Sequence, residues 1–159
     1  MKILSFNVSW ECMSNSLTGT ARNLGTICKN LSKNNYQCRD NLILYLRQIR
    51  NNYNEFDILC FQESSNLDVL KQEFNSNFFF HSHKSGNETM ITIINHNLFN
   101  INDIIPGEFK IGRPFCIFLL ESKVDLKPII LVNLHYCSTF KKDNCNHISD
   151  ILSQTLKNK

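Results

Sequence analysis

Four polar side chains follow apolar stretches of the chain, at points where strands are expected to end. They are Asn7, Glu63, Asn133 and His135. A hard divalent cation such as Mg²⁺ takes carboxylate oxygens together with water and phosphate, and an amide can orient such a carboxylate. An imidazole can donate a proton to a phosphoryl oxygen. These residue types therefore suit metal-assisted hydrolysis of a phosphodiester.

The same four residues also have structural interpretations that need no chemistry. An asparagine at a strand end often forms a turn, and a glutamate after a strand is often simply solvated. A histidine beside a strand often makes only a local hydrogen bond. Residue types and spacing leave both interpretations open.

The elements that would position Asn7 and Glu63 are two strands with a helix between them. Residues 2–8 alternate between apolar and polar, and residues 56–61 contain a continuous apolar run. Both patterns predict strands. Apolar residues recur at helical spacing between them, after the N-cap candidate Asp40. A strand, a crossover helix and a second strand favour parallel neighbours, so Asn7 and Glu63 should lie at the same end of one sheet.

The remaining pattern completes an α/β arrangement. Residues 9–38 are a long polar stretch, interpreted as a functional or mobile loop. We expect an α/β fold of the α+β kind, a mixed sheet with helices packed outside it. The elements expected after Glu63 are a helix at 64–74, a short strand at 78–80, a strand at 89–95, a turn at Pro106–Gly107, antiparallel strands at 115–121 and 128–135, and a closing helix at 148–156.

Composition places the chain among ordinary globular domains. Its 159 residues suit one domain, with 42% hydrophobic and 19% charged residues. The net charge of +3 tolerates an anionic partner but does not by itself indicate nucleic acid. The seven cysteines are odd in number, no apolar signal region follows Met1, and no stretch reaches transmembrane length. We therefore expect an intracellular protein, cytoplasmic or nuclear, without a membrane span.

Three segments carry a family resemblance in their order along the chain. They are Lys2–Val8 (KILSFNV), Asp57–Glu63 (DILCFQE) and Ile130–Tyr136 (ILVNLHY). They resemble the opening motif, the second motif and the asparagine–x–histidine strand of the endonuclease/exonuclease/phosphatase superfamily, the fold of the pancreatic-type deoxyribonucleases. The resemblance runs over nearly the whole chain.

The resemblance implies a role for each of the four residues. Glu63 would hold Mg²⁺, or Mn²⁺ in its place, with Asn7 beside the metal and the substrate phosphate. His135 would act at the scissile phosphate. Asn133 would take part in catalysis or only shape the strand end.

Further charged residues are candidates for the same site. Arg113, in Gly112-Arg-Pro114, would clamp a phosphate or else be a solvated turn arginine. Glu88 lies in a region from which some family nucleases pair a carboxylate with the histidine, so the resemblance makes it a candidate partner of His135. Glu11 is a weaker acidic candidate.

Two motifs of the family have no counterpart in this sequence. One is a Gly-Asp-x-Asn strand end that positions and activates the attacking water, and the other is a terminal Ser-Asp-His. Ser149-Asp150 is followed by Ile151, so it does not match the second. We therefore expect residues 1–159 to form a single domain truncated at its C-terminal end. It would be an incomplete two-sheet sandwich in which this chain supplies mainly one sheet.

Three hypotheses of function follow. The first is a Mg²⁺-dependent nuclease or other phosphodiesterase, with nucleic acid as the favoured substrate, that is inactive as a truncated chain. The second is a non-catalytic relative that acts as a binding module. The third is a zinc module, whose residue types fit but whose spacing does not; its candidate ligands are His135, Cys137, Cys145 and His147. A cysteine–histidine nucleophile has no local support in the sequence.

Overall fold

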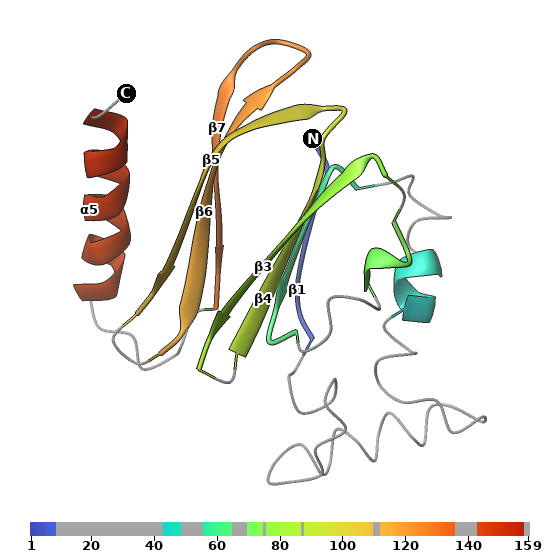
Figure 1. Cartoon of the computed structure of the whole chain (residues 1–159), viewed down its shortest axis with the longest axis horizontal. Coiled ribbons are helices and arrows are strands. Elements are labelled where there is room, and N and C mark those ends of the chain that lie inside the picture. Colours follow the sequence, from blue (N-terminus) through green and yellow to red (C-terminus); the bar gives the residue numbers. More distant parts are fainter. Residues whose placement is uncertain are drawn as a thin grey trace, which may run out of the picture.

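The structure is a computed structural model of the whole chain. It describes residues 1–8, 43–48, 56–64, 70–74, 76–86, 88–109, 112–135 and 143–157. Within these residues two β-sheets pack face to face, with helices on the outside (Figure 1). The expected fold class, strands in two sheets with outer helices, is confirmed.

The first sheet carries the predicted parallel pair. Its strand order is β1-β2-β4-β3, and β1 runs parallel to β2 while the other two pairs are antiparallel. Since β2 lies inside the sheet and is covered on both faces, all of its residues are buried. The strands are β1 (Ile3–Asn7), β2 (Ile58–Gln62), β3 (Phe78–Ser85) and β4 (Glu88–Asn95).

The second sheet is an antiparallel meander in the order β5-β6-β7. The predicted antiparallel pair at the end of the chain is confirmed as the β6–β7 hairpin, closed by a hydrogen bond from Ser122 N to Lys127 O of 2.9 Å. The strands are β5 (Phe99–Glu108), β6 (Pro114–Ser122) and β7 (Pro128–Leu134).

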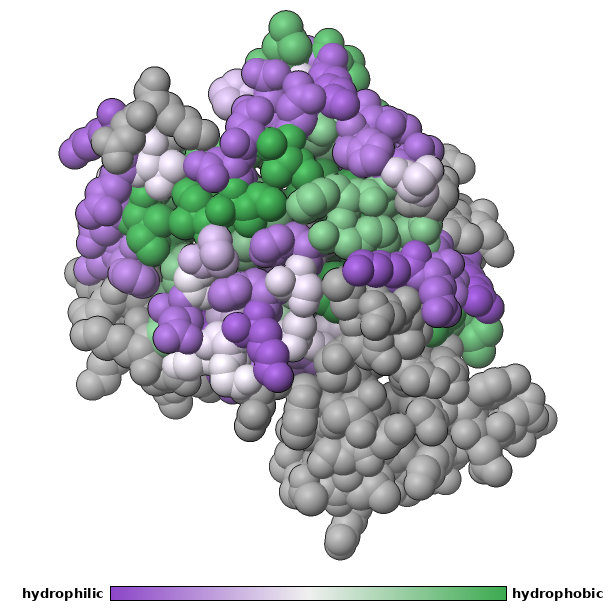
Figure 2. All heavy atoms as spheres, viewed as in Figure 1, coloured by the Kyte–Doolittle hydropathy of each residue, from purple (hydrophilic) through white to green (hydrophobic). Residues whose placement is uncertain are grey.

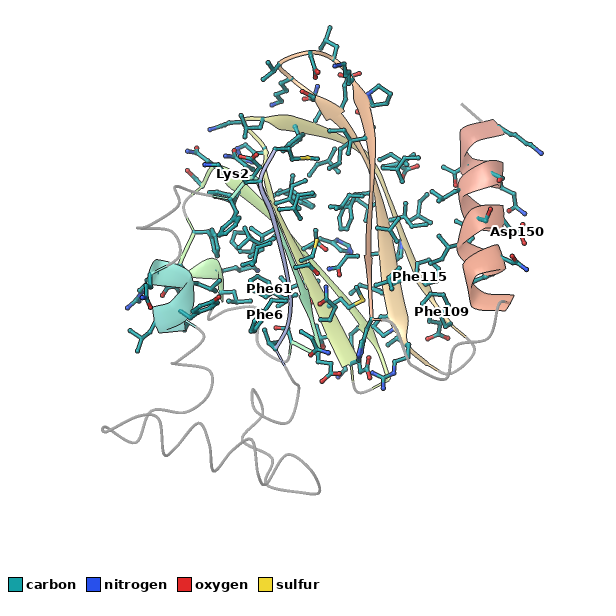
Figure 3. All side chains as sticks on the ribbon, turned by 180° about the vertical axis from the view of Figure 1, so that it is seen from behind. Lys2, Phe6, Phe61, Phe109, Phe115 and Asp150 are labelled. Carbon is teal, nitrogen blue, oxygen red and sulfur yellow. The ribbon has the colours of Figure 1, made fainter. Side chains whose placement is uncertain are left out.

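Side-chain alternation gives each sheet two apolar faces. The faces that meet between the sheets contain Ile58 and Ile94 from the first sheet and Phe118 and Leu120 from the second, all buried. The outer faces are covered by helices. Figure 3 shows Phe61 on the side of the helix at 43–48 and Phe115 on the side of α5, which the packing clusters confirm.

Helix α5 (Asp143–Lys157) confirms the predicted closing helix and begins earlier than expected. Its residues Ile148, Ile151 and Leu152 pack on the outer face of the second sheet. Of the first predicted helix, residues 43–48 are helical, and Asp40 lies outside the described residues. No helix in the described part of the chain is long and apolar enough to cross a membrane.

The expectation that the chain supplies mainly one sheet is wrong. The described strands divide into a four-stranded and a three-stranded sheet. The error comes from β5, where a turn was predicted at Pro106–Gly107. Both residues lie inside this strand, paired with Cys116 and Phe115 of β6. Proline is tolerated there because β5 pairs on one side only among the described strands.

Gly107 has a packing reason to stand in a strand. A Cβ at this position would lie 2.3 Å from the ring of Phe115, so only glycine lets the ring lie over the backbone of β5.

The short strand predicted at 78–80 is also corrected, because β3 extends to Ser85. Its second half alternates inward and outward residues, with Ser82 and Lys84 exposed, as an edge strand does.

A shallow pocket of about 420 Å³ opens between the sheets, at the end opposite the carboxyl ends of β1 and β2. It is formed by the starts of β3 and β5 together with Lys123 after β6. Figure 2 shows apolar surface crossing this face of the molecule. The pocket is lined by Phe79, His96, Phe99, Asn100, Ile101, Asp103, Ile104 and Lys123.

Candidate active site

The parallel pairing of β1 and β2 brings the first two site residues together. The register aligns Asn7 with Gln62, so Glu63 follows directly beside the end of β1. Asn7 Nδ2 donates to Glu63 Oε1 at 3.1 Å. The prediction that Asn7 and Glu63 lie at one end of one sheet is therefore confirmed.

Glu63 has an unusual backbone conformation. Its φ is 55°, in the left-handed region that non-glycine residues rarely adopt. The residues on either side hold the chain in place, because Val8 N donates to Gln62 O at 3.0 Å and Ser64 N donates to Thr89 O at 2.8 Å. Such conformations persist where the surroundings enforce them, and they concentrate at functional sites.

His135 reaches the same place from the second sheet. It directly follows β7, and its Nε2 lies 3.1 Å from Glu63 Oε1 and 3.4 Å from Asn7 Nδ2. Since Glu63 follows β2 of the first sheet, the site lies between the ends of two sheets and not at the end of one.

The other ring nitrogen of His135 contacts the two additional candidates. Nδ1 lies 3.0 Å from Glu88 Oε2 and 2.6 Å from Arg113 Nη1. Glu88 begins β4, and Arg113 immediately precedes β6. Arg113 also forms an ion pair with Glu88 and lies 3.8 Å from Glu63 Oε1. The structure thus brings together Asn7, Glu63, Glu88, Arg113 and His135.

The Nδ1 atom of His135 has two different kinds of neighbour. With a proton on Nδ1 the ring can donate to Glu88, and without one it can accept a hydrogen bond from Arg113. Nε2 can donate to Glu63 when it carries a proton.

Charged groups surround His135 in a partly shielded place. Among the described residues, the carboxylates of Glu63 and Glu88 lie beside the guanidinium of Arg113. Their side chains are only 18%, 19% and 28% exposed, which strengthens the interactions between these charges.

The donor set fits a hard cation held by few protein ligands. Glu63 offers a carboxylate and Asn7 an amide oxygen, and Mg²⁺ usually completes its shell with water and substrate phosphate. Among the described residues there is no cluster of three or more histidine, cysteine, aspartate or glutamate side chains able to enclose a metal. The residues therefore fit an open Mg²⁺ or Mn²⁺ site better than a closed structural one.

Asn133 lies beneath the site. It is 1% exposed, and its Nδ2 donates to Thr92 Oγ1 at 2.9 Å and to Ile91 O at 3.2 Å. Its Oδ1 accepts from Gln62 Nε2 at 2.8 Å. Its amide is fully used inside the protein, two residues before His135.

Gln62 was not identified as a site residue from the sequence. It is 7% exposed, and its Nε2 is also 3.3 Å from Ser5 Oγ and from Cys60 O. The sequence signal that could have identified Gln62 is a glutamine at the end of an apolar run that is buried on both faces. A buried amide is retained only if its hydrogen bonds are satisfied, so this position predicts a cross-strand or cross-sheet partner.

The geometry of the described residues supports neither the zinc hypothesis nor the thiol hypothesis. Glu11 and Cys137 lie outside them, as does the side chain of Cys145. The ring of His147 packs edge-on against Phe115 on the outer face of the second sheet. Cys60 and Cys116 are buried, and burial raises the pKa of each thiol to about 12, which disfavours the reactive thiolate.

Comparisons of sequence identify no relative. No protein-family model matches the chain, and no curated protein matches it. The comparison of structures does find neighbours, all of them endonuclease/exonuclease/phosphatase proteins.

Three of these neighbours show the extent of the likeness. An endonuclease/exonuclease/phosphatase family protein from Bacteroides thetaiotaomicron has 13% identity and a TM-score of 0.68, over 100% of this chain and 58% of that chain. The mannosyl-6-phosphatase Bt3783 of the same species has 13% identity and a TM-score of 0.66, over 98% and 60%. D. rerio TDP2, complexed with single-strand DNA product, has 10% identity and a TM-score of 0.57, over 98% and 54%.

The chain therefore spans a little over half the length of each of these neighbours. At these identities the likeness shows the fold, which agrees with the one implied by the three sequence motifs.

Proposed function

Because the chain has the fold of the endonuclease/exonuclease/phosphatase superfamily, we propose that it acts in metal-dependent hydrolysis of phosphodiesters, with nucleic acid as the substrate. One observation carries the proposal. Glu63, Asn7 and His135 come from three strands of two sheets and meet within 3.4 Å of one another. A packing role alone would not require a carboxylate, an amide and an imidazole to converge at the sheet ends.

Glu63 and Asn7 would hold Mg²⁺, with Mn²⁺ as a substitute, and the ion would neutralise phosphate charge when bound. Arg113 would contact a non-bridging phosphate oxygen, since a guanidinium matches the geometry of phosphate. Glu88 would keep Arg113 and the His135 ring in place through the contacts described above.

His135 would serve as the proton donor at the phosphate. Its Nε2 faces Glu63 and Asn7, where a phosphate held by the cation would lie. Glu88 orients the ring from the opposite side by accepting from Nδ1. An imidazole in this place could donate that proton as a general acid.

We assign no general base for the attacking water among the described residues. General bases of this kind contribute roughly 10²- to 10⁴-fold to rate. We therefore expect turnover by these 159 residues alone to be slow or absent. The single-domain assignment to residues 1–159 is likewise a proposal.

Nucleic acid is our first choice of substrate, and a sugar phosphate is the competitor. TDP2, a neighbour, is described in complex with a single-strand DNA product, whereas Bt3783 is described as a mannosyl-6-phosphatase. The net charge of +3 is compatible with a polyanion.

The decisive experiment compares wild type with Glu63→Gln on a 5′-labelled single-stranded oligonucleotide and on mannose 6-phosphate. We expect at most slow cleavage of the oligonucleotide with MgCl₂, no cleavage with EDTA, and cleavage below detection in Glu63→Gln. Cleavage that persists in Glu63→Gln or in EDTA would show that the site is misassigned.

A non-catalytic binding module is the second candidate, since no general base for the attacking water is assigned among the described residues. It predicts Mg²⁺-dependent oligonucleotide binding, weakened in Glu63→Gln, without any cleavage. Fluorescence anisotropy with the same oligonucleotide measures this. If wild type neither cleaves nor binds, both candidates fail.

A further inference from the structure

Two buried amides connect the sheets directly beneath the candidate active site. Gln62 Nε2, at the end of β2, donates to Asn133 Oδ1 of β7 at 2.8 Å. Asn133 Nδ2 continues the connection to β4 through Ile91 O and Thr92 Oγ1. We call the Gln62–Asn133 hydrogen bond, together with the two bonds to β4, the amide bridge. It joins three strands from two sheets.

The position of the amide bridge relates it to the chemistry. Gln62 is the residue before Glu63, and Asn133 is two residues before His135. Glu63 and His135 belong to different sheets, and their 3.1 Å contact depends on how those sheets are placed against each other. Apolar packing between sheets is non-directional and tolerates sliding, whereas hydrogen bonds fix distance and angle.

Burying the two amides costs free energy, and a contribution to stability does not by itself explain why they are present. Both side chains are buried in a layer that is otherwise largely apolar, and replacing a matched polar pair by apolar groups of similar shape is often neutral for stability. A fully satisfied buried network instead specifies one arrangement of its elements.

We propose that Gln62 and Asn133 are positioning residues that set the distance between Glu63 and His135. The proposal rests on the proposed function for its consequence in catalysis, but its structural claim stands without it. The sequence-based assignment of Asn133 to catalysis is replaced here by an indirect role, since its amide is used within the protein.

The test uses isosteric variants that remove the bridge without emptying the core. Gln62→Met and Asn133→Leu each delete the Gln62–Asn133 hydrogen bond, and the double variant removes both of its partners. Leu120→Ala serves as a matched control, because it destabilises the same layer at the far end of β6 and touches neither amide. If Asn133→Leu does not fold, Thr92→Val removes one partner of Asn133 in its place.

We expect kcat on the oligonucleotide to fall roughly ten- to a hundredfold in each single variant, with KM changed less than about threefold, because small misplacements of reacting groups cost this much. The double variant should lose no more than the worse single variant, since each single variant already removes the Gln62–Asn133 hydrogen bond. Losses that multiply in the double variant, or that match the loss of folded protein as in Leu120→Ala, would overturn the proposal.

A second measurement does not require activity. In wild type the Asn7 side-chain amide lies 3.4 Å from His135 Nε2, so a nuclear Overhauser effect should connect its protons to the His135 ring. We expect this signal to weaken in Gln62→Met and to persist in Leu120→Ala. If these 159 residues alone show no hydrolysis, this signal decides on the bridge by itself, and its persistence in Gln62→Met rejects the bridge.

Discussion

At the scale of single residues, the partners of the His135 ring decide what the site can do. Carboxylates lie beside both nitrogens, and a guanidinium lies beside one of them. Glu88 contacts both neighbours through different oxygens, Arg113 through Oε1 and His135 through Oε2, so these three side chains hold one another in place.

The first prediction concerns Arg113. Arg113→Met should raise KM for the oligonucleotide by about tenfold or more, because a hydrogen bond to a charged group contributes roughly 1.5–3 kcal/mol. Arg113→Lys should recover part of the loss, since it restores the charge without the planar fork. Steady-state kinetics, or anisotropy if turnover is absent, measures both. An unchanged affinity in Arg113→Met would remove Arg113 from the substrate contacts.

The second prediction concerns the two core thiols. Burial raises the pKa of Cys60 and of Cys116 to about 12, so both remain protonated at pH 8. Iodoacetamide at this pH should label neither residue in the folded protein within the time that labels both after denaturation. Mass mapping of the labelled peptides checks this. Rapid labelling of Cys60 in the native protein would show that the layer between the sheets opens.

The residue scale was also where sequence reasoning succeeded best and where it had a clear limit. Asn7, Glu63 and His135 follow strands, and polar residues at strand ends have a local signature that can be recognised without a structure. Gln62 has the same surroundings, but its importance depends on Asn133, which is 71 residues away in the sequence. No local pattern reports a partner at that distance.

At the scale of elements, β3 presents two histidines to the layer between the sheets. The His81 ring packs edge-on against Phe118, and its Nε2 is buried without a hydrogen-bond partner among the described residues. His83 Nε2 lies 3.0 Å from Gly107 O of β5. A proton added to His81 Nε2 would therefore meet no acceptor among these residues, whereas a proton on His83 Nε2 can be donated to the carbonyl oxygen of Gly107.

The third prediction follows from His81. Burial, followed by the nearby His83, lowers the pKa of His81 below its ordinary value of 6.5. Below that pH the unfolded chain binds a proton that the folded chain resists, so stability is complete above about 6.5 and falls as the pH drops. Thermal unfolding between pH 5 and 8 measures this. The slope should flatten in His81→Phe, and an equal slope in both proteins would assign the effect elsewhere.

The fourth prediction concerns the β6–β7 hairpin. Leu126 has a φ of 54°, where a Cβ crowds the backbone, and its side chain is 69% exposed. Leu126→Gly should therefore stabilise the protein by about 1 kcal/mol. Leu126→Ala is the matched control, because it removes the side chain but keeps the Cβ, and it should give no such gain. Chemical denaturation of the three proteins compares them, and equal gains would rule out backbone strain as the cause.

At the scale of the whole molecule, the site lies where two sheets end side by side (Figure 1). The parallel β1–β2 pair could be predicted because a helix between two strands constrains their direction. The β6–β7 pair of the second sheet could also be predicted, but β5 could not, because it contains Pro106 and Gly107, residues that usually indicate a turn. Gly107 fits in this strand because the ring of Phe115 lies over its backbone, a contact that exists only once β6 has paired with β5.

The open edges of the sandwich affect how the protein behaves in solution. In the described part of the chain, β1 pairs only with β2 and β7 only with β6, and they carry the exposed residues Ile3 (45%) and Ile130 (43%). Unpaired backbone beside exposed isoleucine promotes self-association. We expect Ile3→Lys with Ile130→Lys to raise the soluble yield and to abolish concentration-dependent light scattering. The open edges of the two sheets would then limit the concentration at which the protein can be handled.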